Sequence, residues 1–311
     1  MTGSKHAAVP QLTLEAEAKI ALLLRDPSTE RFEASGVVLK DSIFYVIFDN
    51  APHIGAIAGL SPEADSRLIT PKADDDAGYE DIAYEPSTDR FFLLIEALPH
   101  NDQFMAKVRE YDGAFEHSST DWLPFPLDSP NKGLEALTCL SRGGETYLLA
   151  LCEGNRCQAG EEGRKPGGGR IQVFRRGKQQ WHHQATLHLP ETMWFEDYSS
   201  VAVAGGRIAV VSQSSAAVWV GTLKPSEWAV AEGRTYRFPC DAEGRTVYGN
   251  VEGVAWLTAD QIVAVSDKAK SEQPKRCQAK DQSIHVFSIP SVPEAAGVAD
   301  AAVDAGRRAD R

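Results

Sequence analysis

The stretch that decides the fold is Glu252-Gly253-Val254-Ala255-Trp256, which is followed by a turn at residues 257–260 and by the apolar run 262–265. Both apolar segments are shorter than a typical helix, and the second is rich in β-branched residues. Turn residues separate them. The stretch therefore predicts two neighbouring β-strands joined by a tight turn.

The same pattern occurs four more times in the chain. Each copy begins with Ser or Glu, continues with a mostly small residue and a short apolar segment, and is followed by a turn and a second apolar run. The copies begin at Ser35, Glu80, Glu135, Ser199 and Glu252, and the second runs are residues 43–48, 91–95, 147–151, 208–211 and 262–265. The starts lie 45 to 64 residues apart, which leaves room for further strands in each repeat.

Further strand-like segments follow in the later repeats, at 170–174 and 184–189, at 217–221 and 235–238, and at 283–289. The fifth repeat has only three such segments, whereas the apolar segment 19–24 near the N-terminus has no repeat of its own. Four-stranded units repeated around an axis and closed by an N-terminal strand describe a five-bladed β-propeller. The alternative is a β-sandwich whose strands resemble one another by chance.

This interpretation divides the 311 residues into an N-terminal extension (1–18), the propeller (19–290) and an Ala-rich tail (291–311), expected to be disordered or a marginal helix. The net charge of −12 argues against nucleic acid or an anionic membrane surface as the main partner. Residues 1–12 contain no apolar leader segment, and no apolar run is long enough to span a membrane. We therefore expect a cytoplasmic protein.

The first residues of the five repeats are the candidate metal ligands. The first strand of each propeller blade lines the central channel, so these residues should form a ring: Ser35, Glu80, Glu135, Ser199 and Glu252. Three carboxylates facing one another repel, and a cation on the axis relieves that repulsion. Mixed oxygen ligands suit Ca²⁺ better than Mg²⁺, which requires octahedral geometry. Alternatively, the glutamates only cap strand ends in a wet channel, or the ion is a structural plug.

The order Ser, Glu, Glu, Ser, Glu, one per blade, resembles the axial calcium site of the calcium-activated nucleotidases, the five-bladed apyrases. Ser35-Gly36-Val37, Tyr198-Ser199-Ser200 and Glu252-Gly253-Val254 are similar to segments of that family. The Glu-Gly starts also resemble the phytase-like and SdiA-regulated propellers. The resemblance covers residues 19–289 and implies an axial Ca²⁺ and hydrolysis of phosphate-containing substrates.

The second strands of the blades should end at one mouth of the channel. The residues there are acidic or polar, and those expected to bind a ligand are Asp49, Asn50, Glu153, Gln213 and Lys268. With few bases among them, the mouth favours a cationic or metal-bridged small molecule.

Two histidines are the candidate acid–base groups. His53 and His100 each follow a proline and lie four residues after an acid, in neighbouring repeats. Histidine titrates near neutral pH and suits general acid or base catalysis. We predict His53, His100, Glu96 and Asp267 as the catalytic residues. The alternative is a shared Pro-His turn with both rings in solvent.

The five cysteines do not predict a disulfide framework, because their number is odd and no leader segment is present. Arg156-Cys157-Gln158 and Arg276-Cys277-Gln278 recur in equivalent loops of the third and fifth repeats. A neighbouring cation lowers the pKa of a thiol, but inert or redox-sensitive cysteines are also consistent with this motif.

The sequence leaves three functions open. We favour a Ca²⁺-dependent hydrolase that acts on a phosphate-containing or other anionic small molecule at the channel mouth. The alternatives are a non-catalytic ligand-binding propeller with a structural metal, and a scaffold whose outer loops bind a protein partner.

Overall fold

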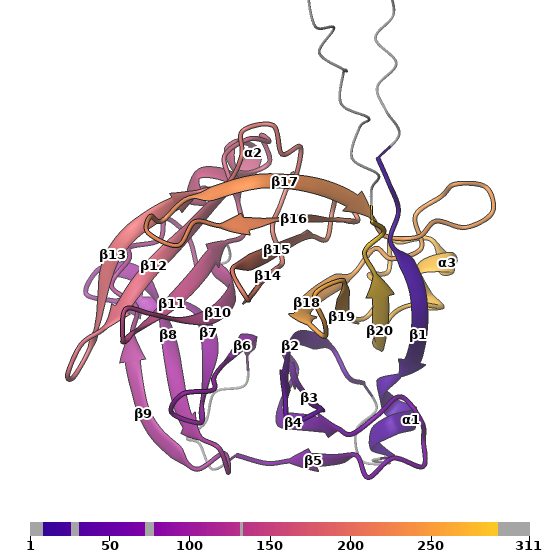
Figure 1. Ribbon diagram of the computed structural model, residues 1–311, viewed down its shortest axis with the longest axis horizontal. Helices are drawn as coiled ribbons and strands as arrows, with labels where there is room; N and C mark the ends of the chain where they lie inside the picture. The colour runs from indigo at the N-terminus through magenta and orange to yellow at the C-terminus, as the bar shows by residue number, and fades with distance from the viewer. Residues whose placement is uncertain (1–8, 26–30, 72–77, 131–132, 292–311) are drawn as a thin grey trace, which may run out of the picture.

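Five antiparallel sheets of four strands each form a ring around a central axis (Figure 1). The computed structural model describes residues 9–25, 31–71, 78–130 and 133–291. The chain is therefore a five-bladed β-propeller, as the repeats predict, and the alternative of a β-sandwich is wrong.

The blades follow one another along the chain, each beginning with its innermost strand. Blade 1 contains β2 (Ala34–Lys40), β3 (Ile43–Phe48), β4 (Ala51–Ile57) and β5 (Arg67–Ile69). Blade 2 contains β6 (Tyr79–Glu85), β7 (Arg90–His100), β8 (Gln103–Asp112) and β9 (His117–Trp122). Blade 3 contains β10 (Leu134–Arg142), β11 (Glu145–Cys152), β12 (Arg170–Arg176) and β13 (Trp181–His188). Blade 4 contains β14 (Ser200–Ala204), β15 (Arg207–Ser212), β16 (Ala217–Leu223) and β17 (Val230–Arg237).

Blade 5 joins the two ends of the described chain. It contains β18 (Val251–Trp256), β19 (Gln261–Ser266), β20 (Ser283–Ser288) and, as its outer strand, β1 (Thr13–Lys19). The helical segments are α1 (Ile20–Leu24), η1 (Asn155–Cys157), α2 (Gly160–Gly163) and α3 (Lys275–Gln278). None of the described helices is long and apolar enough to cross a membrane.

The hydrophobic core is divided among the interfaces between blades. Each pair of neighbouring blades encloses one cluster of buried apolar side chains. Between blades 1 and 2, for example, Tyr45 packs against Phe91 with ring centroids 5.1 Å apart. Burial of this apolar surface drives the blades together, so the ring is stabilised by sheet-on-sheet packing.

Closure by an N-terminal strand is confirmed, but the expected position of that strand is wrong. Thr13 pairs with Ser288 and Lys19 with Ser283, so all of the closing strand except Lys19 lies in the segment expected to be an extension before the propeller. The apolar residues at 20–24, expected to form the strand, form α1 instead. Ile20, Leu23 and Leu24 are buried there at helical spacing, whereas β1 alternates exposed glutamates with alanines, as suits an outer strand. In the expected C-terminal tail, all residues after 291 lie outside the described part of the chain.

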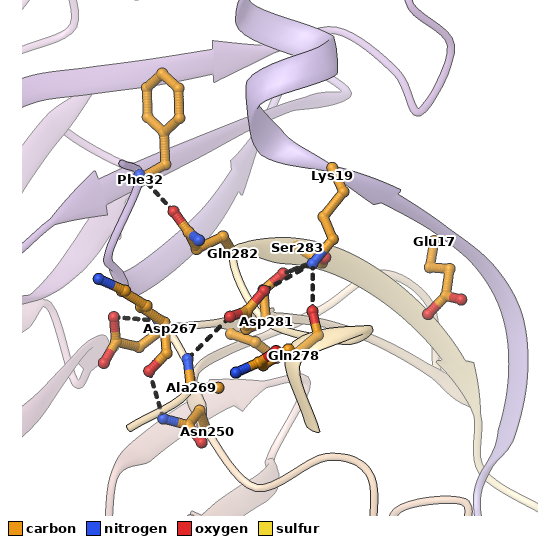
Figure 2. A network of polar contacts seen from close by, with 12 residues as sticks. Glu17, Lys19, Phe32, Asn250, Asp267, Ala269, Gln278, Asp281, Gln282 and Ser283 are labelled. Atoms are coloured by element: carbon orange, nitrogen blue, oxygen red, sulfur yellow. Dashed lines mark hydrogen bonds and ion pairs between the residues drawn. The ribbon is translucent and has the colours of Figure 1, made fainter. Parts of the chain in front are cut away.

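A polar network fixes the closing strand to blade 5 (Figure 2). Lys19 Nζ donates to Asp281 Oδ1 at 2.8 Å, and Asp281 Oδ2 accepts the Ala269 amide at 3.0 Å. Glu17 accepts a hydrogen bond from His285 Nδ1 at 3.2 Å. Burial lowers the pKa of His285, so this contact joins a neutral imidazole to a carboxylate. The network connects β1 to the loop that follows β19.

Candidate functional site

The five ring residues occupy equivalent positions, four of them at β-bulges of the innermost strands and Ser199 directly before β14. In four of these strands the pairing register skips one residue, and the skipped residues are Ser35, Glu80, Glu135 and Glu252. In blade 4 the Ser199 amide donates to the Val211 carbonyl at 3.0 Å, and Val211 also pairs with Ser200. A bulge redirects the side chain of its extra residue. The register therefore supports the alignment of the repeats, including Ser199 rather than Ser200.

The two ring serines connect neighbouring inner strands. Ser35 Oγ donates to the Tyr79 carbonyl at 2.7 Å, and Ser199 Oγ donates to the Val251 carbonyl at 2.9 Å. Each acceptor belongs to the residue directly before the ring glutamate of the next blade. Both serines are buried, and the lone pairs of their hydroxyl oxygens remain available as acceptors.

The ring glutamates lie close to the acids at the ends of the second strands. Burial, together with the charges of Glu96, Asp49 and Glu153, raises the pKa of Glu80 to about 8. Burial also raises the pKa of Glu135 well above its usual range, with Glu153 and Glu80 as the main charged neighbours. The structure therefore brings these predicted acids together.

The third ring glutamate belongs to the same group of acids. Burial, with repulsion from Asp267 and Asp49, raises the pKa of Glu252 well above its usual range. Lys270 opposes this shift, and Gln213 Nε2 donates a hydrogen bond to the Glu252 carboxylate. The predicted ligand residue Gln213 thus contacts a ring residue directly.

A tighter acidic cluster lies at one side of the mouth and includes a residue that the sequence analysis missed. Glu33, Asp49 and Asp267 each place a carboxylate oxygen within 4.8 Å of the other two. Among the described residues, no other group of three acidic, His or Cys side chains lies this close together. The carboxylates of the three ring glutamates are therefore farther from one another than those of this cluster. Burial raises the pKa of Asp49 to about 6 and that of Asp267 to about 7, with Glu33 contributing to both shifts. Glu33 lies two residues before the ring residue Ser35, and this closeness in sequence is the signal that could have identified it.

The remaining predicted ligand residues lie beside this cluster. Asn50 Oδ1 accepts the Glu33 amide at 3.4 Å, and the Lys268 amide donates to Asp267. The Lys268 carbonyl accepts a hydrogen bond from Asn250 at 2.7 Å (Figure 2). These bonds fix the backbone of the mouth on the side of blades 1 and 5.

On the side of blades 3 and 4, loops enclose a cavity of about 420 Å³. Its lining combines acids with two basic residues, and the residues that matter here are Glu153, Gln213, Arg164, Lys270, Glu196 and Asp197. Asp197 accepts hydrogen bonds from Ser212 Oγ at 2.6 Å and from the Ser214 amide at 3.1 Å. Because Glu153 and Gln213 also belong to the axial group, the cavity adjoins the ring.

The predicted acid–base residues divide between two places. Glu96 and Asp267 belong to the axial acids. His53 lies on β4 and bonds through Nδ1 to Thr70 Oγ1 at 3.0 Å, while His100 packs at a tilt against Trp122 of β9 with ring centroids 4.1 Å apart. The contacts of the two imidazoles are thus with the outer parts of their own blades.

The cysteines differ from the expectation. Cys152 and Cys157 form a disulfide across the start of the blade 3 loop, whereas Cys139, Cys240 and Cys277 are thiols. Pairing depends on how this loop folds back on β11, which the spacing of the cysteines does not reveal.

Comparison with known proteins identifies no family for the chain. No protein-family profile matches the chain, and no curated protein sequence matches it. Among solved structures, similar chains include the PQQ-bound aldose sugar dehydrogenase of Streptomyces coelicolor, with 12% identity and a TM-score of 0.47 over 88% of this chain and 98% of that one. Another is a GH43 β-xylosidase/α-arabinofuranosidase from a compost metagenome, with 9% identity and a TM-score of 0.49 over 89% and 94% of the two chains.

Proposed function

We propose that the protein binds Ca²⁺ at the acidic mouth of its channel and hydrolyses a phosphate-containing or other anionic small molecule held beside it. The observation that carries this proposal is the convergence of the three ring glutamates with the four acids at the strand ends. Buried carboxylates at such a density need a counter-charge. Carboxylate and hydroxyl oxygens are ligands that Ca²⁺ accepts in flexible geometry.

Two neighbouring sets of residues are the alternative holders of the ion. The first is the ring of Ser35, Glu80, Glu135, Ser199 and Glu252. The second is Glu33, Asp49 and Asp267, whose oxygens lie close enough to meet on one cation. The sets overlap electrostatically, since Asp49 and Asp267 both act on the Glu252 carboxylate. A bound Ca²⁺ would polarise an oxygen of the substrate as a Lewis acid.

The cavity beside the ring suits the anionic part of the substrate. Arg164 and Lys270 contribute its positive charges, and Glu153 joins the cavity to the acids of the axis. An anion in this position would bridge the metal and the two bases. The acids of the lining disfavour an anion without the metal, so we expect ligand binding to require Ca²⁺.

A non-catalytic binding propeller is the second candidate. The placement of His53 and His100 against the outer strands favours it, because no predicted imidazole then contacts the axial acids. In the hydrolase, Glu96 and Asp267 would carry the acid–base work instead. The raised pKa of Asp267, about 7, suits a group that exchanges protons near neutral pH.

Calorimetric titration of EDTA-treated protein with Ca²⁺ and Mg²⁺ tests the metal site. We expect Ca²⁺-selective binding and a stabilisation of about 2.7 kcal/mol at a hundredfold excess over Kd. Loss of binding in Glu135→Gln would assign the ion to the ring, and loss only in Asp267→Asn would assign it to the mouth cluster. Glu145→Gln, which removes an exposed carboxylate from blade 3, is the control. Absence of binding by the wild-type protein would refute the proposal.

Hydrolysis is tested separately, with a panel of phosphate esters and anhydrides in the presence of Ca²⁺. Turnover that EDTA abolishes, and that His53→Ala and His100→Ala leave intact, would support catalysis by the axial acids. Tight Ca²⁺ binding without turnover of any member of the panel would favour the binding propeller.

A further inference from the structure

The disulfide brackets part of the wall of the mouth cavity, since Glu153, Gly154 and Gln158 line the cavity beside the two cysteines. Cys152 is the last residue of β11 and is completely buried, whereas Cys157 ends η1 and is partly exposed. Between them lie Glu153, which acts on the ring glutamates, and Gly154, which lines the cavity. The bridge therefore closes a short loop whose residues belong to the candidate site.

The bridged loop has a strained and tightly packed backbone. Arg156 and Cys157 adopt φ angles of 58° and 56°, in the left-handed region that non-glycine residues avoid. The Gln158 carbonyl fits against two glycines, since a Cβ at Gly154 or Gly163 would lie 2.0 Å from its oxygen. A small movement of Cys157 would therefore be transmitted to both glycines and to the cavity wall.

A buried amide is directed at the two sulfurs. Gln172 is 1% exposed, and its Oε1 accepts hydrogen bonds from Thr186 Oγ1 at 2.7 Å and His183 Nε2 at 2.8 Å. Its Nε2 consequently faces Cys157 Sγ at 3.3 Å and Cys152 Sγ at 3.7 Å. A disulfide sulfur is a weak acceptor, whereas a thiolate accepts such a bond strongly. The Gln172 amide can thus also stabilise the two cysteines after reduction, when one of them is a thiolate.

We propose that the Cys152–Cys157 disulfide is a redox latch that holds the wall of the mouth cavity in its ligand-binding shape. The thiolate of an external dithiol attacks the accessible Cys157 sulfur, the S–S bond breaks, and Cys152 leaves as a thiolate that takes up a proton. The second thiol of the reductant then closes its own disulfide and releases Cys157 as a thiol. Two electrons and two protons pass from the dithiol to the protein.

Reduction relaxes the wall without unfolding the blade. The left-handed residues Arg156 and Cys157 are released, while the Asn155 side chain still binds the Gly163 carbonyl at 3.0 Å and the Gly168 amide at 2.9 Å. The change is therefore confined to residues 156–158 and the glycines packed against them. The reduced protein therefore binds Ca²⁺ with lower affinity, and this part of the inference rests on the proposed function.

Peptide mapping and hydrogen exchange test the latch without reference to activity. Trypsin cleaves after Arg156, so the bridge joins two tryptic peptides that separate only on reduction. In the oxidised protein the Arg156 amide bonds to Gly168 at 2.6 Å and the Cys157 amide to Gly154 at 3.0 Å. We expect exchange at these amides to rise at least about fivefold on reduction, and the Ca²⁺ affinity to fall by a similar factor, the lower end of typical coupling between sites.

The controls exploit the equivalent loop of blade 5. The Cys277 amide bonds to the Pro274 carbonyl at 2.9 Å, and because Cys277 is a thiol in both redox states its exchange should not change. The variant Cys152→Ser/Cys157→Ser should behave like the reduced wild-type protein, whereas Cys277→Ser should retain the redox response.

Several results would overturn the latch. One is separate tryptic peptides from protein equilibrated with glutathione disulfide, because the bridge then does not form. A second is equal exchange in the two redox states, which would make the bridge a static brace. A third is a changed wall with an unchanged Ca²⁺ affinity, which would refute the regulation. If neither form binds Ca²⁺, the proposed function fails, and the exchange data alone decide on the latch.

Discussion

Neutralising Glu80 should change how the stability of the metal-free protein depends on pH. Burial, with repulsion from Glu96, Asp49 and Glu153, raises the pKa of Glu80 to about 8 from 4.5. Between these two values the folded state binds more protons than the unfolded state, so the free energy of unfolding falls as the pH rises from about 4.5 to about 8. The direction is opposite to that of a carboxylate in an ion pair.

The size of the effect follows from the same shift. At ~1.4 kcal/mol per pKa unit, the full interval corresponds to at most about 5 kcal/mol. Water reaches the mouth, so we expect about 2–3 kcal/mol of this in practice. Glu80→Gln removes the charge and keeps the shape of the side chain, and it should stabilise the metal-free protein by that amount at pH 8 while changing little at pH 4.5.

Urea denaturation in EDTA, at fixed ionic strength and at several pH values from 4.5 to 8, measures this difference. Glu145→Gln, with its exposed carboxylate, is the control and should follow the wild-type curve. Ca²⁺ at pH 8 should remove most of the difference between Glu80→Gln and the wild type by stabilising the latter. A Glu80→Gln curve that runs parallel to the wild-type curve across this interval would show that the axial acids are not forced together.

Three further changes test the surrounding structure. Gly36→Ala would place its Cβ 2.3 Å from Asp81 Oδ1 and 3.0 Å from backbone atoms. Urea titration should therefore show a free energy of unfolding lowered by about 1–3 kcal/mol. Gly59→Ala, whose Cβ would have its nearest contact at 3.5 Å, is the control and should be neutral in the same titration. Asn155→Ala removes buried hydrogen bonds to the Gly163 carbonyl and the Gly168 amide of the blade 3 loop. It should destabilise the loop by about 2–3 kcal/mol and accelerate limited proteolysis there. Hydrogen bonding to His285 lowers the pKa of Glu17 to about 2, so Glu17→Gln should remove about 1 kcal/mol of stability at pH 7, a difference from wild type that vanishes as the pH falls from about 4.5 to 2.

The architecture was predictable because the inner strands of each blade, above all the second, are largely buried on both faces. Such strands read as short continuous apolar runs, and the run at 43–48 coincides with β3. Outer strands leave a weaker signal, since one face meets water. The closing strand was misplaced for this reason: the strongly apolar residues of α1 concealed the alternation in Thr13–Lys19.

The candidate site was predictable only where it repeats. The five ring positions recur once per blade, so aligning the repeats was enough to find them. Of the other repeats, only the fourth has an acid at the position of Glu33, namely Asp197 two residues before Ser199, and the approach of Glu33 to Asp49 and Asp267 depends on how blades 1 and 5 meet. Sequence proximity also misled, because His53 follows Asp49 closely, whereas β4 carries its ring to Thr70 at the outer side of the blade.

The bulges allow the residues of the ring to vary while the strand pairing of each blade is kept. A residue skipped by the pairing register contributes no cross-strand partner, so Ser35 or Glu252 can change identity while the ladder of its blade stays in place. At the four bulged positions the identity of the residue is thus not tied to the strand pairing within its own blade. The same propeller can thereby carry different combinations of charged side chains along its axis without a change in its strand pairing.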